Sequence, residues 1–277
     1  MPELTHPRSE RVRSVRALAG RSVRERRGKF LVEGPQGVRE VVRFRPEQVQ
    51  EVVLTPEAAS RYAEVLDAAQ AAGLTVRTGT PEVLLAMSPD AQGILAVADV
   101  WDTAGTALPA HPRLVAVLST VRDPGNAGAV IRAADAAGAD AVILAGESVD
   151  PFNPKVVRST AGSLFHLPVL RAPDLDEVLG RLRSVGCAVL AADGTAPHDL
   201  DDLLDRAAAG GPEDAGGGPD LRAPTAWLFG NEAHGLSEEE LLAADAAVRV
   251  PLRGAAESLN LATAAAVCLY ASARAQR

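Results

Sequence analysis

The chain has 277 residues, 47% of them hydrophobic and 23% charged, which is typical of a globular protein with room for two domains. No apolar run approaches the ~20 residues that a membrane-spanning helix requires, so a membrane protein is excluded. The net charge of −8 excludes a surface that is basic throughout, as in many nucleic-acid-binding proteins.

The N-terminus and the few possible metal ligands narrow the setting. The first residues are polar and rich in arginine, without the apolar segment of a secretory signal. Cys187 and Cys268 lie in apolar stretches and are expected to be buried free thiols rather than a disulfide or a metal site. The five histidines show no ligand spacing. We expect a cytoplasmic protein without a membrane segment and without a metal.

Positive charge is concentrated at the N-terminus. Residues 1–30 contain nine Lys or Arg and three acidic residues, a local excess of +6 in a chain that is acidic as a whole. A basic segment on an acidic body favours contact with nucleic-acid phosphates; a solvent-exposed helix face is the alternative. The residues that we expect to make this contact are Arg24, Arg26, Arg27 and Lys29.

Helices and strands alternate over residues 1–100. A basic helix is predicted over residues 8–19. The other predicted elements are strands at Lys29–Glu33, Val49–Leu54, Leu74–Arg77 and Ile94–Val100, and helices at Gly34–Arg43, Pro56–Ala72 and Pro81–Met87. This alternation predicts a small α/β sandwich domain. Residues 101–112, rich in Gly, Thr and Pro, are predicted to be a linker.

The pattern of residues 113–277 predicts a second α/β domain. Its strands are unbroken apolar runs, typical of a parallel sheet covered on both faces: Leu114–Leu118, Ala141–Ala145, Cys187–Ala191, Ala226–Phe229 and Ala247–Val250. Helices are predicted near Ala127–Ala137, Pro154–Ser163, Leu175–Ser184, Leu200–Ala208, Glu238–Ala243 and Leu259–Arg274. The low-complexity segment Ala209–Pro219 is expected to be a mobile surface insertion.

The first of three polar turns in this domain follows the strand at Leu114–Leu118. Asp123-Pro124-Gly125 makes the turn, and Asn126 is expected to cap the following helix. A helix N-terminus next to glycine offers free N–H groups to an anion, and the Arg132 side chain leans back towards it. Asn126 and Arg132 are therefore candidates to share a phosphate or a ribose. The alternative is a capped helix with a surface Arg132 paired to Asp135.

The second and third turns have the same strand–turn–helix form. Gly230-Asn231-Glu232 follows the apolar run ending at Phe229, and Glu232 fits either a catalytic acid or an N-terminal helix acid. The third turn ends in Ser258-Leu259-Asn260, residue types that suit helix capping or ligand contact. We expect the three turns to meet at one site. The dinucleotide-binding fingerprint G-x-G-x-x-G is absent, which argues against a nucleotide-dependent oxidoreductase.

The three turns resemble the motifs of the SpoU (TrmH-like) RNA ribose methyltransferases of the SPOUT class. The resemblance rests on Asn126-x-Gly128-x-x-x-Arg132, on Phe229-Gly230-Asn231-Glu232-x-x-Gly235-Leu236-Ser237, and on Val250-Pro251-Leu252-x-Gly254-x-x-x-Ser258-Leu259-Asn260. Leu252 stands where many relatives carry Met, a volume-conserving change. Through Lys29-Phe30-Leu31-Val32-Glu33-Gly34, the first domain resembles the substrate-binding domain that often precedes this catalytic domain.

The resemblance implies a C-terminal trefoil knot, a homodimer whose two subunits shape each site, and S-adenosylmethionine bent within the knot and held mainly by backbone groups. The implied cofactor-binding residues are Leu228, Gly230, Val250, Leu252, Ser258 and Leu259. The implied catalytic residues are Asn126, Arg132, Glu232, Ser258 and Asn260. Arg132 is also expected to bind RNA.

The implied roles follow from the chemistry of each side chain. A guanidinium keeps its proton near neutral pH, so we expect Arg132 to orient the ribose or phosphate and to act as a base only after strong perturbation. Asn126 is expected to hold that phosphate or ribose, and Glu232 to orient Arg132 or the substrate. Ser258 and Asn260 are expected to fix the third loop and to contact the substrate or the facing subunit.

The expected activity is S-adenosylmethionine-dependent 2′-O-ribose methylation of RNA. The 2′-hydroxyl that accepts the methyl group also distinguishes RNA from DNA. Ribosomal (23S-type) RNA is the preferred substrate because the first domain adds a second RNA-binding surface. Transfer RNA is the alternative substrate. A catalytically silent RNA-binding protein that assists ribosome assembly is the alternative function.

Overall fold

The computed structural model describes residues 2–103, 108–210 and 218–277. They form two compact units. The N-terminal unit comprises Met1–Asp102 with Asp150–His166, and the C-terminal unit comprises Thr103–Val149 with Leu167–Arg277. The linker expected at residues 101–112 and the insertion expected at residues 209–219 are each only partly within the described residues.

Residues 150–166 fold with the N-terminal unit, whereas the sequence-based boundaries put them in the second domain. The reason is an aromatic cluster. The Phe152 ring lies 4.8 Å from the rings of both Phe30 and Trp101, and Phe165 lies 6.2 Å from Trp101, between ring centroids. Aromatic side chains bury large apolar areas, so these contacts fix the segment to the N-terminal unit.

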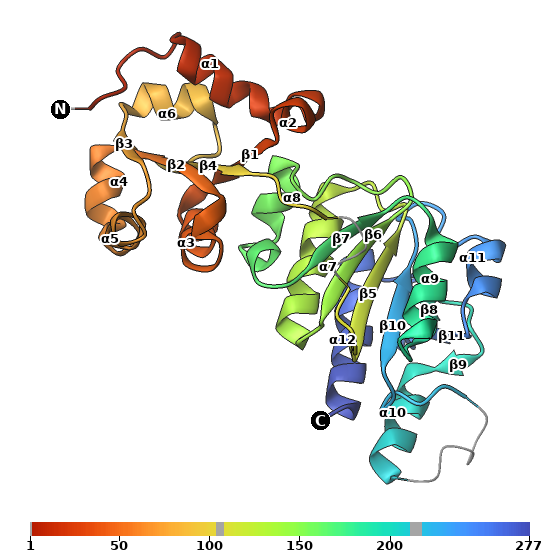
Figure 1. Cartoon of the computed structure of the whole chain (residues 1–277). Coiled ribbons are helices and arrows are strands. Elements are labelled where there is room, and N and C mark those ends of the chain that lie inside the picture. Colours follow the sequence, from red (N-terminus) through yellow and green to blue (C-terminus); the bar gives the residue numbers. More distant parts are fainter. Residues whose placement is uncertain (1, 104–107, 211–217) are drawn as a thin grey trace. The chain divides into compact units, whose positions relative to one another are not determined.

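The N-terminal unit contains a four-stranded sheet in the order β1-β4-β2-β3. Its strands are β1 (Lys29–Glu33), β2 (Val49–Leu54), β3 (Val76–Thr78) and β4 (Ile94–Asp99). β4 is antiparallel to β1 and β2, whereas β2 and β3 are parallel. One face is covered by α1 (Glu10–Arg16) and α6 (Pro81–Met87), and the other by α3 (Gly34–Phe44), α4 (Pro56–Arg61) and α5 (Ala63–Ala71) (Figure 1). This is the predicted α/β sandwich.

Two helices predicted for this unit are interrupted. The helix predicted at residues 8–19 is α1 followed by the 3₁₀ helix η1 (Ala17–Ala19). A further helix that was not predicted, α2 (Arg21–Arg27), begins after Gly20, whose backbone is extended. The segment from residue 56 divides into α4 and α5 at Tyr62, whose backbone is not helical. The unit is completed by α8 (Pro154–Ser159) and the 3₁₀ helices η2 (Pro46–Gln48) and η4 (Ser163–Phe165).

The C-terminal unit is built on a seven-stranded sheet in the order β7-β6-β5-β10-β8-β11-β9. Its strands are β5 (Leu114–Ser119), β6 (Ala141–Ala145), β7 (Val169–Ala172), β8 (Ala188–Ala192), β9 (His198–Asp199), β10 (Thr225–Phe229) and β11 (Ala246–Arg249). All neighbouring strands are parallel. Every residue of β5, β6 and β10 is buried, as predicted for a sheet covered on both faces.

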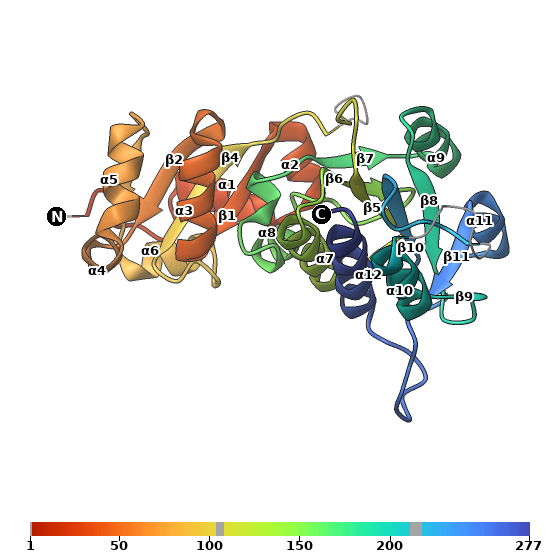
Figure 2. The same cartoon turned by 90° about the horizontal axis from the view of Figure 1, so that it is seen from below.

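Helices cover both faces of this sheet. α7 (Pro124–Ala137), α10 (Leu200–Ala209) and α12 (Leu261–Ala275) lie side by side on one face (Figure 2). α9 (Leu175–Ser184) and α11 (Glu238–Ala243) contribute to the buried apolar core on the other face. The loop that joins β11 to α12 projects away from the helices (Figure 2).

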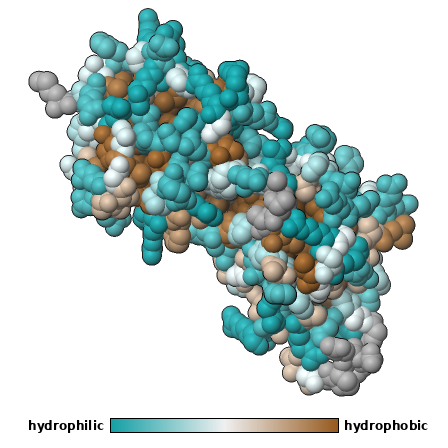
Figure 3. Space-filling view, viewed as in Figure 1, coloured by the Kyte–Doolittle hydropathy of each residue, from teal (hydrophilic) through white to brown (hydrophobic). Residues whose placement is uncertain are grey.

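Among the described helices, none is long and apolar enough to cross a bilayer. The face of the molecule in Figure 3 is hydrophilic over most of its area, with hydrophobic residues in separate patches. Large apolar side chains that are exposed are Phe44, Leu85, Leu242, Leu252, Val267 and Tyr270. Single exposed apolar residues are common, so such a residue indicates a binding site only when its neighbours have a matching chemistry.

Candidate functional site

The three predicted turns lie at the carboxyl edge of the parallel sheet. They follow β5, β10 and β11, which end at Ser119, Phe229 and Arg249. In open α/β sheets the crevice outside this edge is the usual place for a ligand.

Side chains from the three turns form one hydrogen-bonded chain. Nδ2 of Asn260 donates to Oδ1 of Asn126 at 2.9 Å, and Nδ2 of Asn126 donates to Oε1 of Glu232 at 3.4 Å. The same Glu232 oxygen accepts from the backbone N–H of Asp123 at 3.2 Å. The structure therefore brings together three of the residues that the sequence assigned to the site.

Asn126 does not cap α7, contrary to the sequence-based expectation. The helix begins at Pro124, and the side chain of Asp123 caps it by accepting from the backbone N–H of Asn126 at 2.7 Å. Proline favours the first helical position because its missing N–H has no helical partner there. The Asn126 amide is consequently free to bridge Glu232 and Asn260.

Asn260 does cap a helix. Its Oδ1 accepts from the backbone N–H groups of Ala262 at 2.9 Å and Thr263 at 3.4 Å, so α12 begins at Leu261. Its Nδ2 is then directed to Asn126. One side chain both starts the last helix and joins the third loop to the first.

The second turn is folded back on itself at Gly230. A Cβ atom at this position would lie 2.3 Å from the carbonyl carbon of Gly235, a distance that no side chain tolerates. Backbone hydrogen bonds pair Asn231 with Gly235 in both directions. Nδ2 of Asn231 also donates to the carbonyl of Thr120 at 2.8 Å and joins this turn to the first. Asn231 is a positioning residue outside the predicted catalytic and cofactor-binding sets; its place close after an apolar strand is the signal in the sequence.

A cavity of about 370 Å³ opens beside the hydrogen-bonded chain. Its lining includes Gly230, Val250, Leu252, Ser258 and Leu259, five of the six residues implied to bind a cofactor. The sixth, Leu228, is not among the lining residues, and its side chain is fully buried in the core that also includes residues of α9 and α11. Its neighbour Phe229 lines the cavity instead.

The end of β8 and the loop after it are a part of the cavity that sequence reasoning missed. Ala192, Asp193 and Gly194 lie in its wall. Oδ1 of Asp193 accepts from the backbone N–H of Thr195 at 2.8 Å and holds the turn. The signal was available, because these residues directly follow an apolar strand and a parallel strand delivers its next residues to the same edge as its neighbours.

The lining fits a ligand with an apolar ring and a positive charge. Phe229, Val248, Val250 and Leu259 provide apolar walls. Three carboxylates, those of Asp193, Glu232 and Glu257, also line the cavity, and the lining within the described residues holds no Lys, Arg or His. A nucleoside with a sulfonium and an ammonium group matches these apolar walls and carboxylates, whereas the carboxylates would repel a polyphosphate.

Arg132 lies on α7 with its side chain exposed, and within the described residues it forms no hydrogen bond or ion pair. The expected contact between Glu232 and Arg132 is not made; Glu232 instead contacts Asn126 and Asp123. The Arg132 guanidinium is therefore available to an incoming group.

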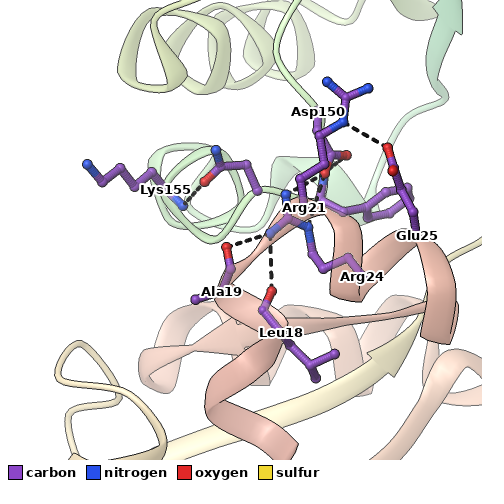
Figure 4. A network of polar contacts seen from close by, with 9 residues as sticks. Leu18, Ala19, Arg21, Arg24, Glu25, Asp150 and Lys155 are labelled. Atoms are coloured by element: carbon purple, nitrogen blue, oxygen red, sulfur yellow. Dashed lines mark hydrogen bonds and ion pairs between the residues drawn. The ribbon is translucent and has the colours of Figure 1, made fainter.

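Arg24, expected to bind nucleic acid, is buried in the N-terminal unit, with 3% of its surface exposed. Its Nε and Nη2 donate to Oδ2 of Asp150 at 3.0 and 2.6 Å, and Nη1 donates to the carbonyls of Leu18 and Ala19 (Figure 4). A guanidinium with these partners cannot reach a phosphate. Arg24 is removed from the RNA-binding set, and its role is to hold the segment that begins at Asp150.

The other basic residues of this set differ in availability. Arg26 and Arg27 are exposed, and one Arg27 nitrogen donates to the carbonyl of Ser14 at 3.0 Å. Lys29 is half-buried, and its Nζ lies 2.9 Å from Oδ1 of Asp99. Exposed guanidinium groups are the better phosphate ligands, so Arg26 and Arg27 remain and Lys29 is the weaker candidate.

Both cysteines are buried free thiols, which confirms the interpretation from sequence. Burial raises the pKa of Cys268 to about 12, and burial together with the charge of Asp140 raises the pKa of Cys187 to about 11. In the part of the chain that the structure describes, no group of three or more His, Cys, Asp or Glu side chains is placed to hold a metal ion.

Known proteins match both parts of the chain. Residues 113–270 match the SpoU rRNA Methylase family, and residues 9–96 match the MRM3-like substrate binding domain. The 23S rRNA (guanosine(2553)-2′-O)-methyltransferase RlmP of Bacillus subtilis (strain 168) is 31% identical over 98% of this chain and 98% of its own. The 23S rRNA (uridine(2479)-2′-O)-methyltransferase of Streptomyces viridochromogenes is 40% identical over 154 residues, 54% of this chain and about half (49%) of that relative's length.

Solved structures with the same fold include two that hold AdoMet. The SpoU methyltransferase AviRb from Streptomyces viridochromogenes, in complex with AdoMet, has a TM-score of 0.80 and 30% identity, covering 96% of this chain and 98% of its own. The AdoMet-bound rRNA methyltransferase from Sinorhizobium meliloti has a TM-score of 0.77 and 28% identity, covering 98% and 97%. Each likeness extends over nearly the whole chain and includes both units.

Proposed function

We propose that this chain, which belongs to the SpoU rRNA methylase family, transfers a methyl group from S-adenosylmethionine to a ribose 2′-hydroxyl of 23S ribosomal RNA. The observation that carries the proposal is the hydrogen-bonded chain Asn260–Asn126–Glu232 beside the cavity. It places all three motif loops around one position. RlmP, a relative that matches almost the full length, is named as a 23S rRNA 2′-O-methyltransferase, and AviRb was solved with AdoMet.

The cavity would hold S-adenosylmethionine, which when bound supplies a methyl group activated by a sulfonium sulfur. The apolar walls at Phe229, Val248 and Leu259 suit the adenine ring. The carboxylates of Asp193 and Glu257 suit the positive charges of the ligand. The compact turn at Gly230 lets the backbone approach the ligand closely.

The protein's task is to hold the ribose hydroxyl in line and to ease the loss of its proton, since the methyl donor supplies the reactivity. The exposed guanidinium of Arg132 is available to bind the ribose or its phosphate and to stabilise the oxygen as it becomes negative. Because a guanidinium stays protonated near neutral pH, Arg132 orients the substrate and stabilises charge, and the hydroxyl proton passes to the solvent.

Asn126 is the second substrate ligand in this proposal. Its amide is held by Asn260 on one side and Glu232 on the other. A side-chain amide has two N–H donors and two acceptor lone pairs, so one donor and one acceptor site remain for the ribose or phosphate. Ser258, which is exposed and lines the cavity, completes the third loop beside it.

A ribosomal RNA substrate accords with the N-terminal unit, because residues 9–96 match a substrate binding domain. Arg26 and Arg27 at the end of α2 are the exposed cations through which it would contact phosphates. We also propose a cytoplasmic location, in keeping with this substrate.

We further propose that the enzyme is a homodimer. A groove of about 610 Å³ on the C-terminal unit is lined by residues of α7, α10 and α12. Two large apolar side chains in it, Val267 and Tyr270, are 40% and 51% exposed. A second copy that covers this groove would bury both side chains, and sedimentation equilibrium would then report a mass of twice the chain.

Methyl transfer in vitro tests the proposed function. Unmodified 23S rRNA is incubated with the protein and tritiated S-adenosylmethionine, and the labelled site is located by its resistance to alkaline cleavage, which a 2′-O-methyl group confers. We expect label at a ribose in 23S rRNA and none in DNA of the same sequence. Labelling of transfer RNA alone would overturn the ribosomal substrate, and RNA binding without transfer would indicate a silent assembly factor.

A further inference from the structure

We propose that Phe44 and His166 form a stacking site for an unpaired base of the RNA, on the surface of the N-terminal unit. The site rests on the proposed RNA substrate and deepens it, because it adds a base contact outside the three methyltransferase loops. Its ligand is a single-stranded nucleotide, with the base on the rings and the phosphate on the neighbouring guanidinium.

Phe44 is the last residue of α3 and departs from the pattern of that helix. The preceding apolar residues Val38, Val41 and Val42 are at most 4% exposed, whereas Phe44 is 44% exposed. Burying an aromatic side chain is favourable, because a large apolar area leaves the solvent. The ring is thus presented to solvent at the end of a helix whose other large apolar residues face the core.

His166 comes from the other end of the unit's sequence and lies against this ring. The two ring centroids are 4.4 Å apart, with planes tilted by 54°. Nε2 of His166 lies 3.3 Å from Oε2 of Glu40, one turn before Phe44 on α3. The imidazole is therefore held in place by a carboxylate that is itself only 8% exposed.

The backbone leading to His166 is shaped so that it can approach α3. Gly162 has φ +105°, and a Cβ atom there would lie 2.4 Å from Cγ of Glu40. Only glycine is compatible with both this conformation and this distance. Two aromatic rings from distant parts of the chain are consequently brought together on one surface by a close contact that excludes every other residue.

The charges around the rings favour a nucleotide as the ligand. The Arg43 guanidinium lies 5.2 Å from the Phe44 ring centroid, is exposed, and forms no ion pair with a described residue. Arg39 is exposed one turn earlier and is paired with Glu40. RNA-binding proteins stack unpaired bases on aromatic rings and guanidinium planes and hold the phosphates with arginine. An apolar peptide would not use this cationic rim.

The test measures binding of the full-length protein to a fluorescein-labelled single-stranded 12-nucleotide oligoadenylate, by anisotropy at fixed salt. Phe44→Leu keeps an apolar side chain but removes the ring. We expect it to weaken binding about 5- to 150-fold, the range for one stacked base. Phe44→Trp should restore binding to within about twofold of wild type, since every aromatic face can stack. Leu85→Ala is the matched control, because Leu85 is 65% exposed in the same unit, and it should leave binding unchanged.

Equal binding by Phe44→Leu and wild type, at equal melting temperatures, would overturn the stacking site, as would an equal loss with Leu85→Ala. Should Phe44→Leu melt early, Arg43→Gln at the same surface decides the matter, with an expected loss of about two- to fivefold. Methyl transfer to 23S rRNA is measured on the same samples. If the wild type transfers methyl groups and neither variant weakens oligoadenylate binding, the stacking site alone is refuted. If the variants weaken oligoadenylate binding but the wild type transfers no methyl group, the proposed function alone is refuted.

Discussion

Asn126 and Asn260 are hydrogen-bonded through their side chains although 134 residues separate them in the sequence. Asn126 lies in the first turn of α7 and Asn260 caps α12. These two helices pack against each other on one face of the sheet (Figure 2). The position of the Asn126 amide therefore depends on a helix–helix contact as well as on the loops themselves.

Replacing Asn126 tests this dependence. Asn126→Ala removes the acceptor for Asn260 and the donor to Glu232. We expect kcat/KM for methyl transfer to fall about 100-fold, the effect of a small misplacement of reacting groups, with S-adenosylmethionine affinity nearly unchanged. Thr263→Ala, at an exposed position of the first turn of α12, is the control. Full activity of Asn126→Ala would show that the hydrogen-bonded chain has no part in catalysis.

Arg132 should act on the substrate and not on the cofactor, since its side chain is exposed and it is not part of the cavity wall. Arg132→Ala should lower methyl transfer about 1,000-fold, as for loss of a charge-stabilising donor. Arg132→Lys should retain part of the activity because it keeps the charge but not the planar donor geometry. Isothermal titration calorimetry should give wild-type S-adenosylmethionine affinity for both variants; lost cofactor binding would count against the assignment.

Two glycines of the site loops offer a matched pair. At Gly230 a Cβ atom would meet the backbone of Gly235 at 2.3 Å, whereas at Gly254 it would meet nothing within 4 Å. Gly230→Ala must open the second turn and should abolish S-adenosylmethionine binding measured by calorimetry. Gly254→Ala should bind like wild type. If the two variants bound equally well, the compact turn would not be part of the cofactor site.

The exposed and the buried arginines of α2 should affect different properties, RNA binding and stability. The double change Arg26→Gln and Arg27→Gln removes two exposed charges and should reduce the slope of log K against log salt for RNA binding by about 1.5. Arg24→Gln leaves Asp150 buried without its partner and should instead destabilise the protein by about 3 kcal/mol or more. Urea unfolding and RNA titrations at several salt concentrations measure both; a reduced salt slope with unchanged stability in Arg24→Gln would contradict the burial argument.

The cysteines predict a dependence on alkaline pH. Their folded-state pKa values, about 11 for Cys187 and about 12 for Cys268, lie above the ordinary value of 9.0. The folded protein therefore holds its thiol protons where the unfolded chain releases them, so the free energy of unfolding should be insensitive to these groups below pH 9 and fall between pH 9 and 12. At pH 8 the native protein should not react with a thiol reagent, while in urea two thiols should react. Rapid reaction of the native protein would refute their burial.

The convergence of the three turns was predictable, because parallel strands deliver the residues after them to one edge of the sheet. The start of α7 could also be predicted, since Pro124 suits the first helical position. The sequence-based cap, Asn126, is wrong because the side chain of Asp123 caps the helix. The sequence does not show whether Leu228 or Phe229 lines the cavity. A strand buried on both faces has no polar alternation to show which side chain points to a cavity.

The burial of Arg24 had no signal in the local sequence. Its partner Asp150 is 126 residues away, in a segment that the apolar pattern assigns to the second domain. From sequence alone, a run of basic residues predicts a solvent-exposed or phosphate-binding surface, because a carboxylate far away in the sequence cannot be recognised as its partner. The C-terminal trefoil knot stays a prediction from the family resemblance.

The measurement that tests the central claim most directly is ribose-methylation mapping of 23S rRNA from cells that lack this protein, carry it, or carry Arg132→Ala. We predict that one ribose loses its 2′-O-methyl group in the deletion, regains it with the wild-type chain and stays unmethylated with Arg132→Ala. An unchanged methylation map in the deletion, or full restoration by Arg132→Ala, would contradict the account.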